Sequence, residues 1–301
     1  MRPCDTEGVQ TTLSTWIAGS RPKTLPAAIV PVAVGYATVV ARHGEQVPDV
    51  RNAILALLVS VALQVGVNYA NDYSDGVKGT DSRRVGPLRL VGSGLVEARR
   101  VKRAALTSFF VAALAGLGIA ATTSWWLLLV GVASIIAAWT YTGGPNPYGY
   151  LGFGELFVFV FFGVVATVGT TYAVSERIEG IDVVASCVVG ALAVALLIVN
   201  NLRDIPTDQQ SGKKTLAVRL GDARTRLLYC AVLLAAAVGI VVVGVDRSWS
   251  LVGVVGFVFS YKPLSRVVRK ARGTELIPVL GGTARVQLVV GMLFAFGLVA
   301  S

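Results

Sequence analysis

Long apolar runs separated by short polar breaks follow one another along almost the whole chain. A helix that crosses the hydrocarbon core of a bilayer needs roughly 20 apolar residues. Runs of that order occur nine times, and we expect helices at residues 25–41, 52–70, 104–121, 125–141, 156–174, 183–199, 227–245, 249–261 and 286–300. The eighth run is short, so seven or eight helices remain alternatives. The pattern predicts an all-α fold, a polytopic membrane bundle of about nine transmembrane helices, in a single domain over residues 1–301.

The composition agrees with a membrane protein. Hydrophobic residues make up 54% of the chain and charged residues only 15%, whereas soluble domains carry roughly 25% charged residues. This composition excludes disordered, collagen-like and disulfide-scaffold proteins. The three cysteines, Cys4, Cys187 and Cys230, are far apart and form no C-x-x-C spacing, so we expect neither disulfides nor a zinc site. The first apolar run starts only at Leu25, and we expect no cleaved signal peptide.

The charges are distributed unevenly between the two sides of the predicted bundle. The chain has 27 Lys and Arg residues against 17 Asp and Glu, a net charge of +10. Of those 27 residues, 23 fall in the N-terminal segment and in the loops after predicted helices 2, 4, 6 and 8. Basic loops are retained in the cytoplasm, so we expect these segments to face it. We expect no nucleic-acid partner, because the basic residues form no module interleaved with aromatic residues.

A cluster of Asn and Asp residues follows the second apolar run. Its members are Asn68, Asn71, Asp72 and Asp75, with Asp81 a few residues further on. On a continuing helix the first four fall at positions i, i+3, i+4 and i+7, which form one face.

A matching cluster follows the sixth apolar run and consists of Asn200, Asn201, Asp204 and Asp208. Asn201, Asp204 and Asp208 would again share one face of a continuing helix. A single Asn-Asp pair at a helix end is more often a cap or a solvated turn. Two matched clusters on the same membrane side favour a binding site instead.

The two clusters have the composition of a site for a metal-bound diphosphate. Carboxylates that lie close together at a membrane boundary repel one another unless a positive group joins them. Mg²⁺ prefers oxygen ligands and is usually bound by one or two carboxylates plus substrate phosphates. Basic residues on the same side can bind the phosphate oxygens, although the positive-inside bias alone would place most of them there. The candidates are Lys23, Arg89, Lys213 and Lys214.

Taken together, these motifs resemble the UbiA superfamily of intramembrane prenyltransferases, and the resemblance extends over nearly the whole chain. That superfamily has an N-D-x-x-D motif after helix 2 and a second Asp-rich motif after helix 6. The segments R-P-K-T-L-P-A at 21–27, N-Y-A-N-D-Y-S-D at 68–75, N-N-L-R-D at 200–204 and G-K-K-T-L-A at 212–217 are most similar to the branch that prenylates 1,4-dihydroxy-2-naphthoate. Gly79 stands where hydroxybenzoate-type members usually carry an Asp, which favours the naphthoate branch. Asn200 stands where many relatives have an Asp.

The resemblance implies an enzyme of menaquinone biosynthesis in the bacterial plasma membrane, with its active-site loops in the cytoplasm. Its substrates would be polyprenyl diphosphate and 1,4-dihydroxy-2-naphthoate, and decarboxylation would give demethylmenaquinol or its quinone. Mg²⁺, or another divalent cation, would be bound by Asn71, Asp72, Asp75, Asp81, Asp204 and Asp208. The catalytic residues would be Asp72, Asp75, Asp204 and Asp208. Further ligand contacts would come from Asn68, Asn71, Asn200, Asn201, Lys23, Arg89, Lys213 and Lys214.

Several alternatives stay open at the level of the sequence. Homogentisate or 4-hydroxybenzoate could replace the naphthoate as acceptor. A cation-coupled secondary transporter also uses intramembrane Asp and Asn residues, but its sites lie near the bilayer midplane rather than at helix ends. The aromatic run at 157–162 would face lipid or the core, or would line a prenyl cavity. Glu155 is a candidate general base but is equally explained as a charge at a helix N-terminus.

Overall fold

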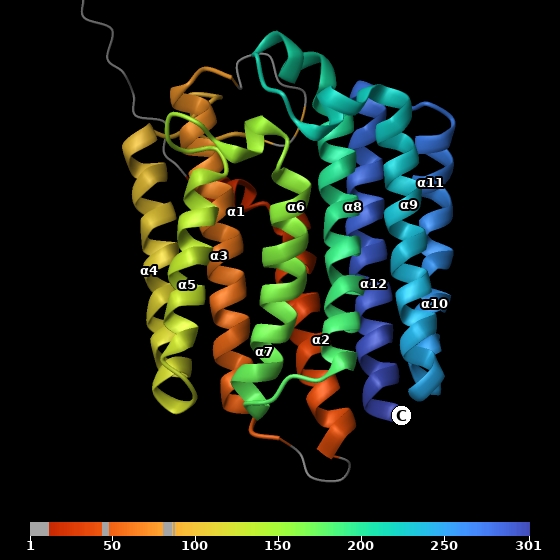
Figure 1. Ribbon diagram of the computed structural model, residues 1–301. Helices are drawn as coiled ribbons and strands as arrows, with labels where there is room; N and C mark the ends of the chain where they lie inside the picture. Colours follow the sequence, from red (N-terminus) through yellow and green to blue (C-terminus); the bar gives the residue numbers. More distant parts are fainter. Residues whose placement is uncertain (1–11, 44–47, 81–85, 87) are drawn as a thin grey trace, which may run out of the picture.

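The computed structural model describes residues 12–43, 48–80, 86 and 88–301. Within these ranges the protein is a bundle of roughly parallel and antiparallel helices and has no strand (Figure 1). The α-helices are α1 (Leu13–Ser20), α2 (Pro26–His43), α3 (Val50–Val77), α4 (Ala98–Thr122), α5 (Trp126–Thr140), α6 (Gly154–Val158), α7 (Ala166–Ser175), α8 (Gly180–Gln210), α9 (Leu216–Asp246), α10 (Val252–Val255), α11 (Tyr261–Val268) and α12 (Ile277–Ala300). A π-helical stretch, η3 (Phe159–Val165), joins α6 to α7, and short 3₁₀ turns are η1 (Pro22–Thr24), η2 (Tyr148–Leu151), η4 (Ser248–Leu251), η5 (Gly256–Ser260) and η6 (Gly273–Leu276).

The predicted all-α membrane bundle is confirmed. Among the described residues, seven helical segments are long and apolar enough to cross a bilayer: Val50–Val77, Ala98–Thr122, Gly154–Ser175, Gly180–Gln210, Leu216–Asp246, Ser248–Val268 and Gly273–Ala300. Leu13–Thr24 and Pro26–Arg42 qualify together as an eighth segment with a 52° bend, and α5 is a shorter apolar helix. Each of the nine predicted runs therefore coincides with one helical segment.

Two helices continue well beyond the ends that hydropathy predicts. We expected the second helix to end at residue 70 and the sixth at residue 199, but α3 runs to Val77 and α8 to Gln210. The added turns carry the two Asn-Asp clusters and are largely buried. Their polar side chains are hydrogen-bonded inside the protein, so a polar sequence does not end the helix here.

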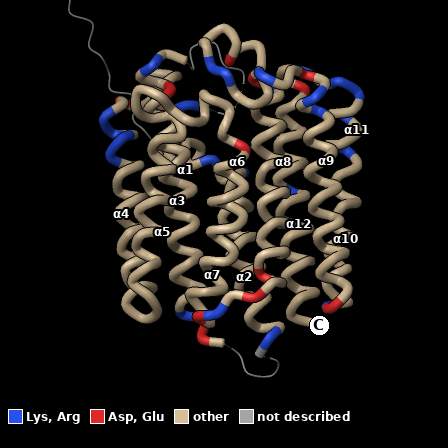
Figure 2. The backbone as a smooth tube through the Cα atoms, viewed as in Figure 1, with Lys and Arg blue, Asp and Glu red and all other residues tan. Residues whose placement is uncertain are grey.

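The loops that we expected on one membrane side lie at one end of the bundle, the upper end in Figure 1. This upper end carries α1, the loop between α3 and α4, the loop between α5 and α6, the turn between α8 and α9, and the turn between α11 and α12. Lys and Arg residues gather there, and only a few lie at the lower end (Figure 2). The basic loops that the sequence assigns to one side are thus found together at one end of the folded molecule.

Helix packing brings an aromatic segment against the second Asp-bearing helix. The α6–η3–α7 segment packs along α8, and Gly163 lies directly against Gly190. A Cβ added to Gly163 would lie 2.4 Å from the Gly190 Cα, so only glycine fits at this contact. The close approach fixes the position of the phenylalanines of this segment relative to α8.

Candidate active site

A cavity of about 680 Å³ runs from the upper end into the interior of the bundle. Its walls come from α2 to α5, the α6–η3–α7 segment, α8 and the start of α12, together with the loops of the upper end. The mouth is polar and contains residues of both Asn-Asp clusters, whereas the interior is lined mainly by apolar and aromatic side chains. A charged group and a long apolar chain of the same ligand can therefore be held in one continuous space.

Asp75 is a carboxylate of the mouth that binds several groups. Its side chain is almost fully buried, and it accepts hydrogen bonds from Arg89 Nη2 at 3.3 Å and from Lys213 Nζ at 3.2 Å. The Tyr150 hydroxyl also donates to it, as does Thr80 Oγ1 at 3.3 Å. One carboxylate thus brings together groups from α3, two loops and the turn after α8.

The second cluster lies on α8 and lines the same cavity. All four of its members, Asn200, Asn201, Asp204 and Asp208, are among the lining residues. Arg203, buried beside them, binds Asp204 with its guanidinium fork at 2.7 and 2.8 Å and also donates to Asn200 Oδ1 at 2.9 Å. This bidentate contact fixes the orientation of the Asp204 carboxylate.

Asp75 and Asp208 occupy equivalent positions at two helix ends of the same kind. Two residues after α3 ends, Gly79 lies in the left-handed region at a φ of 69°, and two residues after α8 ends, Gly212 lies there at a φ of 75°. The amide of the following residue bonds back to the Asp75 carbonyl at 3.1 Å in the first case and to the Asp208 carbonyl at 2.9 Å in the second. These bonds define a Schellman motif, in which glycine is strongly preferred at the left-handed position after the C-cap, here Gly79 and Gly212. The two carboxylates are therefore presented to one cavity by the same local geometry.

Asp72, predicted as a metal ligand and catalytic residue, does not line the cavity. It is fully buried, and its oxygens accept hydrogen bonds from the backbone N–H groups of Leu90 at 2.7 Å and Val91 at 3.0 Å. The residue before this pair is Arg89, which contacts Asp75. Asp72 therefore fixes the loop segment that carries Arg89 rather than facing the mouth.

The predicted phosphate-binding cations divide into two groups. Lys23, Arg89 and Lys213 line the cavity, and so does Arg21. Lys214 does not line it; the side chain is exposed, and its backbone N–H donates to the Tyr150 carbonyl at 2.8 Å. The predicted ligand Asp81 lies outside the described residues.

Tyr150 is a site residue that the sequence analysis missed. Besides its contact with Asp75, its ring lies under two ammonium groups, with Lys213 Nζ 4.5 Å and Lys78 Nζ 5.0 Å from the ring centroid. A glycine- and aromatic-rich loop on the same side as the Asp clusters was the available signal. Nearby, burial raises the pKa of the Tyr148 phenol, and its hydroxyl donates to the Ala137 carbonyl at 2.9 Å.

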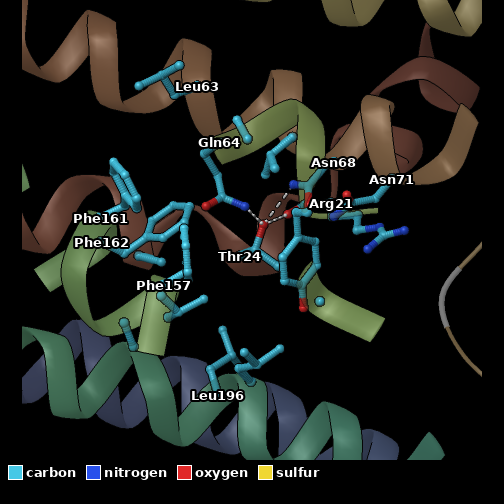
Figure 3. A pocket seen from close by; sticks show the side chains of 18 of the residues that line it. Arg21, Thr24, Leu63, Gln64, Asn68, Asn71, Phe157, Phe161, Phe162 and Leu196 are labelled. Carbon is cyan, nitrogen blue, oxygen red and sulfur yellow. Dashed lines mark hydrogen bonds between the residues drawn. The ribbon is translucent and has the colours of Figure 1, made fainter. Parts of the chain in front are cut away.

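A second missed feature is a polar network deeper in the cavity, centred on Thr24 (Figure 3). Gln64 Nε2 donates to Thr24 Oγ1 at 2.9 Å, and Asn68 Nδ2 donates to the same oxygen at 3.0 Å. Gln64 lies one turn before Asn68 on the same face of α3, and this spacing was the signal that could have found it. The 52° bend between η1 and α2 brings Thr24 to this position.

Aromatic side chains face this polar network across the cavity. Phe157, Phe161 and Phe162 line it opposite Gln64 and Thr24 (Figure 3). Of the alternatives for the aromatic run at 157–162, the structure therefore selects the cavity wall for these three residues. The cavity thus offers hydrogen-bonding groups on one side and aromatic surface on the other.

The donor set at the mouth fits a hard divalent cation that shares its coordination with a ligand. Within the described ranges no three His, Cys, Asp or Glu side chains gather closely enough to enclose a metal by themselves. Three carboxylates and three Asn side chains nevertheless line the mouth, which are Asp75, Asp204, Asp208, Asn71, Asn200 and Asn201. All of them supply oxygen, the ligand that Mg²⁺ prefers when phosphates complete its shell. Glu155 does not line the cavity; its Oε1 accepts from Asn201 Nδ2 at 2.9 Å.

Two bacterial relatives match this chain along most of its length. It is 50% identical over 274 residues to the 1,4-dihydroxy-2-naphthoate octaprenyltransferase of Mycobacterium tuberculosis, covering 91% of this chain and 93% of the relative. It is 36% identical over 299 residues to the Escherichia coli protein of the same name, covering 95% of each.

Solved structures share the fold. A UbiA homolog from Aeropyrum pernix matches with a TM-score of 0.66 at 16% identity, covering 88% of this chain and 96% of that chain. A UbiA homolog from Archaeoglobus fulgidus bound to DMAPP and Mg²⁺ matches with a TM-score of 0.58 at 14% identity, covering 95% and 99%. The model of the UbiA prenyltransferase family matches residues 28–276. The motif resemblance is thus confirmed, and the chain belongs to the UbiA prenyltransferase family.

Proposed function

We propose that this protein transfers a polyprenyl group from polyprenyl diphosphate to 1,4-dihydroxy-2-naphthoate in menaquinone biosynthesis. The observation that carries the proposal is a single cavity in which two Asp-bearing helix ends meet at a polar mouth above an apolar interior. The identity of 50% to a relative named for this reaction supports the choice of acceptor.

The diphosphate of the donor binds at the mouth. Asp75, Asp204 and Asp208 would hold a divalent cation, with Asn71, Asn200 and Asn201 as further oxygen donors. Mg²⁺ would neutralise the charge of the diphosphate leaving group, and the neighbour solved with Mg²⁺ supports this choice of metal. Arg89, Lys213 and Lys23 contact phosphate oxygens.

The reaction forms one carbon–carbon bond, between the prenyl group and the ring, and breaks two bonds, one to the diphosphate and one to the carboxyl carbon. The bond between the allylic carbon and the diphosphate oxygen breaks, and its electron pair leaves with the diphosphate. Arg89 and Lys213 stabilise the negative charge that develops there. The naphthoate ring takes up the prenyl group, and its carboxylate leaves as carbon dioxide, which returns the bonding electron pair to the ring. The apolar walls exclude water, which would otherwise capture the allylic cation.

The acceptor lies between the Thr24–Gln64–Asn68 network and the phenylalanines of the opposite wall. An aromatic ring stacks favourably on such side chains. The Gln64 amide hydrogen-bonds a hydroxyl or carboxylate group of the acceptor, and Asn68 Oδ1 accepts from a hydroxyl, because Asn68 Nδ2 already donates to Ser20 O and Thr24 Oγ1. The prenyl chain occupies the remaining apolar interior. We place the upper end in the cytoplasm of a bacterial plasma membrane, because the basic residues gather there (Figure 2).

Product analysis by mass spectrometry tests the proposal. Detergent-purified protein receives a polyprenyl diphosphate and Mg²⁺, together with either 1,4-dihydroxy-2-naphthoate, 4-hydroxybenzoate or homogentisate. We expect a prenylated, decarboxylated product from the naphthoate alone, and none in the presence of EDTA. Product from another acceptor would replace the acceptor assignment, and undiminished product in EDTA would refute the role of the metal. No product from any acceptor would contradict the reaction itself.

A further inference from the structure

A second pocket lies on the outer surface of the upper end, at the junction of α11 with η6 and α12. Its volume is about 710 Å³, and it shares no lining residue with the active-site cavity. Among its lining residues are Tyr261, Lys262, Ser265, Arg266, Arg269 and Glu275. The reaction uses none of them.

Three cations dominate this pocket. Lys262, Arg266 and Arg269 are exposed and are spaced at i, i+4 and i+7, so they follow one face of α11 and its C-cap. None of the three forms an ion pair within the part of the chain that the structure describes. The one carboxylate of the lining is Glu275, whose Oε2 accepts the Arg272 backbone N–H at 3.1 Å. The pocket therefore has an excess of positive charge.

The pocket is built on a rigid base. Arg226 of α9 is buried and donates to the backbone carbonyls of Val267 at 2.7 Å and Ala271 at 2.9 Å. Asp222 holds the same guanidinium through two hydrogen bonds of 2.7 and 2.8 Å. This pair satisfies carbonyl groups at the end of α11 and fixes the turn that carries Arg269. The cations are thus presented by an ordered backbone.

Directly below the cations, the same membrane segment exposes apolar side chains. Val255, Val258 and Phe259 are 61%, 73% and 49% exposed, and Tyr261 at the border is 72% exposed. An aromatic residue with a polar tip is typical of the interface between hydrocarbon and headgroups. The surface therefore changes from apolar to cationic within about two helical turns, which matches the order of acyl chain and phosphate in a phospholipid.

We propose that this pocket binds the phosphate of an anionic phospholipid from the surrounding bilayer. Lys262, Arg266 and Arg269 contact the headgroup, and the acyl chains lie along the exposed apolar side chains below. A soluble phosphate would meet the same cations, but it would gain nothing from the apolar surface. The bound lipid is separate from the donor, whose diphosphate belongs to the cavity mouth.

Native mass spectrometry and thermal unfolding of the delipidated full-length protein test this inference. The probes are phosphatidylglycerol, phosphatidylcholine with the same acyl chains, and inorganic phosphate. We expect phosphatidylglycerol to bind about tenfold more tightly than phosphatidylcholine and to raise the unfolding temperature. The triple variant Lys262→Gln, Arg266→Gln, Arg269→Gln loses this preference. A charge-matched control, Arg99→Gln, Arg100→Gln, Arg103→Gln, changes three exposed cations of the same end and keeps it.

Each of the other outcomes counts against the proposal. Equal loss of phosphatidylglycerol preference in both triple variants would show that the net charge of the upper end, not this pocket, attracts the lipid. Binding of inorganic phosphate as tight as that of phosphatidylglycerol would rule out the bilayer as the source of the ligand. An unchanged preference in the α11 variant, with its unfolding temperature intact, would exclude the site.

Discussion

Asp75 and Asp208 lie at the same position of two matching helix ends, and both face the cavity mouth. We expect Asp75→Asn and Asp208→Asn each to lower the rate of product formation at least a hundredfold, because an amide cannot neutralise a divalent cation. Both variants should fold, since Asn has the shape of Asp. The measurement is product formation at saturating donor, together with the thermal unfolding temperature. Near-normal turnover in both variants would contradict the binding of a divalent cation by Asp75 and Asp208.

Asp72 is expected to behave differently, although it is only three residues from Asp75. Its carboxylate receives two backbone N–H groups of the Arg89 loop, and charge-assisted bonds of this kind are worth more than neutral ones. We expect Asp72→Ala to lower the free energy of unfolding by about 3 kcal/mol. Unfolding in mixed micelles with increasing dodecyl sulfate measures this, with Lys214→Ala, at an exposed side chain, as the control. A stability equal to that of the control would contradict the structural role of Asp72.

At the scale of the helices, four cavity-lining glycines mark where there is free space. Gly116, Gly131, Gly169 and Gly281 belong to α4, α5, α7 and α12, and a Cβ added to any of them would meet no atom within 4 Å. We expect Gly131→Leu and Gly169→Leu to narrow the apolar interior, so that turnover of an octaprenyl donor falls about tenfold or more while geranyl diphosphate is still used.

The matched control is Val132→Leu, at the next position of α5, where the side chain is 55% exposed. It adds a methylene group on the outer surface of the bundle and should leave both donors unaffected. The measurement is kcat/KM for the two donors. Equal losses for short and long donors would show that the glycines do not line the path of the chain.

The helices themselves were predictable, and their exact ends were not. Hydropathy marks every span, because a bilayer demands apolar side chains on the lipid face. The helix ends that hydropathy predicts are residues 70 and 199, however. The polar residues that follow are buried against other parts of the protein, and hydropathy alone does not indicate this. The Asn-Asp spacing predicted a shared face, and Asn68, Asn71 and Asp75 all line the cavity. Asp72 belongs to the same pattern but is bound by backbone N–H groups of a loop.

Contacts between distant segments explain the rest of what the sequence left open. Tyr150 reaches Asp75 across 75 positions of the chain, and Gln64 reaches Thr24 across 40. No local pattern encodes such pairs, because they depend on how loops and bends fold over the bundle. Adjacent residues can also differ in ways that the sequence does not indicate. After Gly212, Lys213 lines the cavity, whereas the Lys214 side chain is exposed.

For the whole molecule, the uneven distribution of Lys and Arg predicts an orientation. Replacing Cys4, Cys187 and Cys230 by Ala allows single cysteines to be introduced at Ser14 of α1 and at Ser248 near the lower end, both exposed. We expect a membrane-impermeant maleimide to label Ser14→Cys from the cytoplasmic side and Ser248→Cys from the opposite side. Inside-out and right-side-out vesicles provide the two conditions. The reverse pattern would overturn the proposed topology.

The cavity has a polar mouth and an apolar interior within one continuous space, and this has a consequence for kinetics. We expect a polyprenyl donor dissolved in the bilayer to reach the interior by moving in two dimensions, while the released diphosphate would enter water. The relevant concentration of donor would then be its mole fraction among the lipids rather than its molarity in the suspension. Adding inert lipid at constant total donor should slow the enzyme, as surface dilution does for enzymes that draw substrate from a membrane.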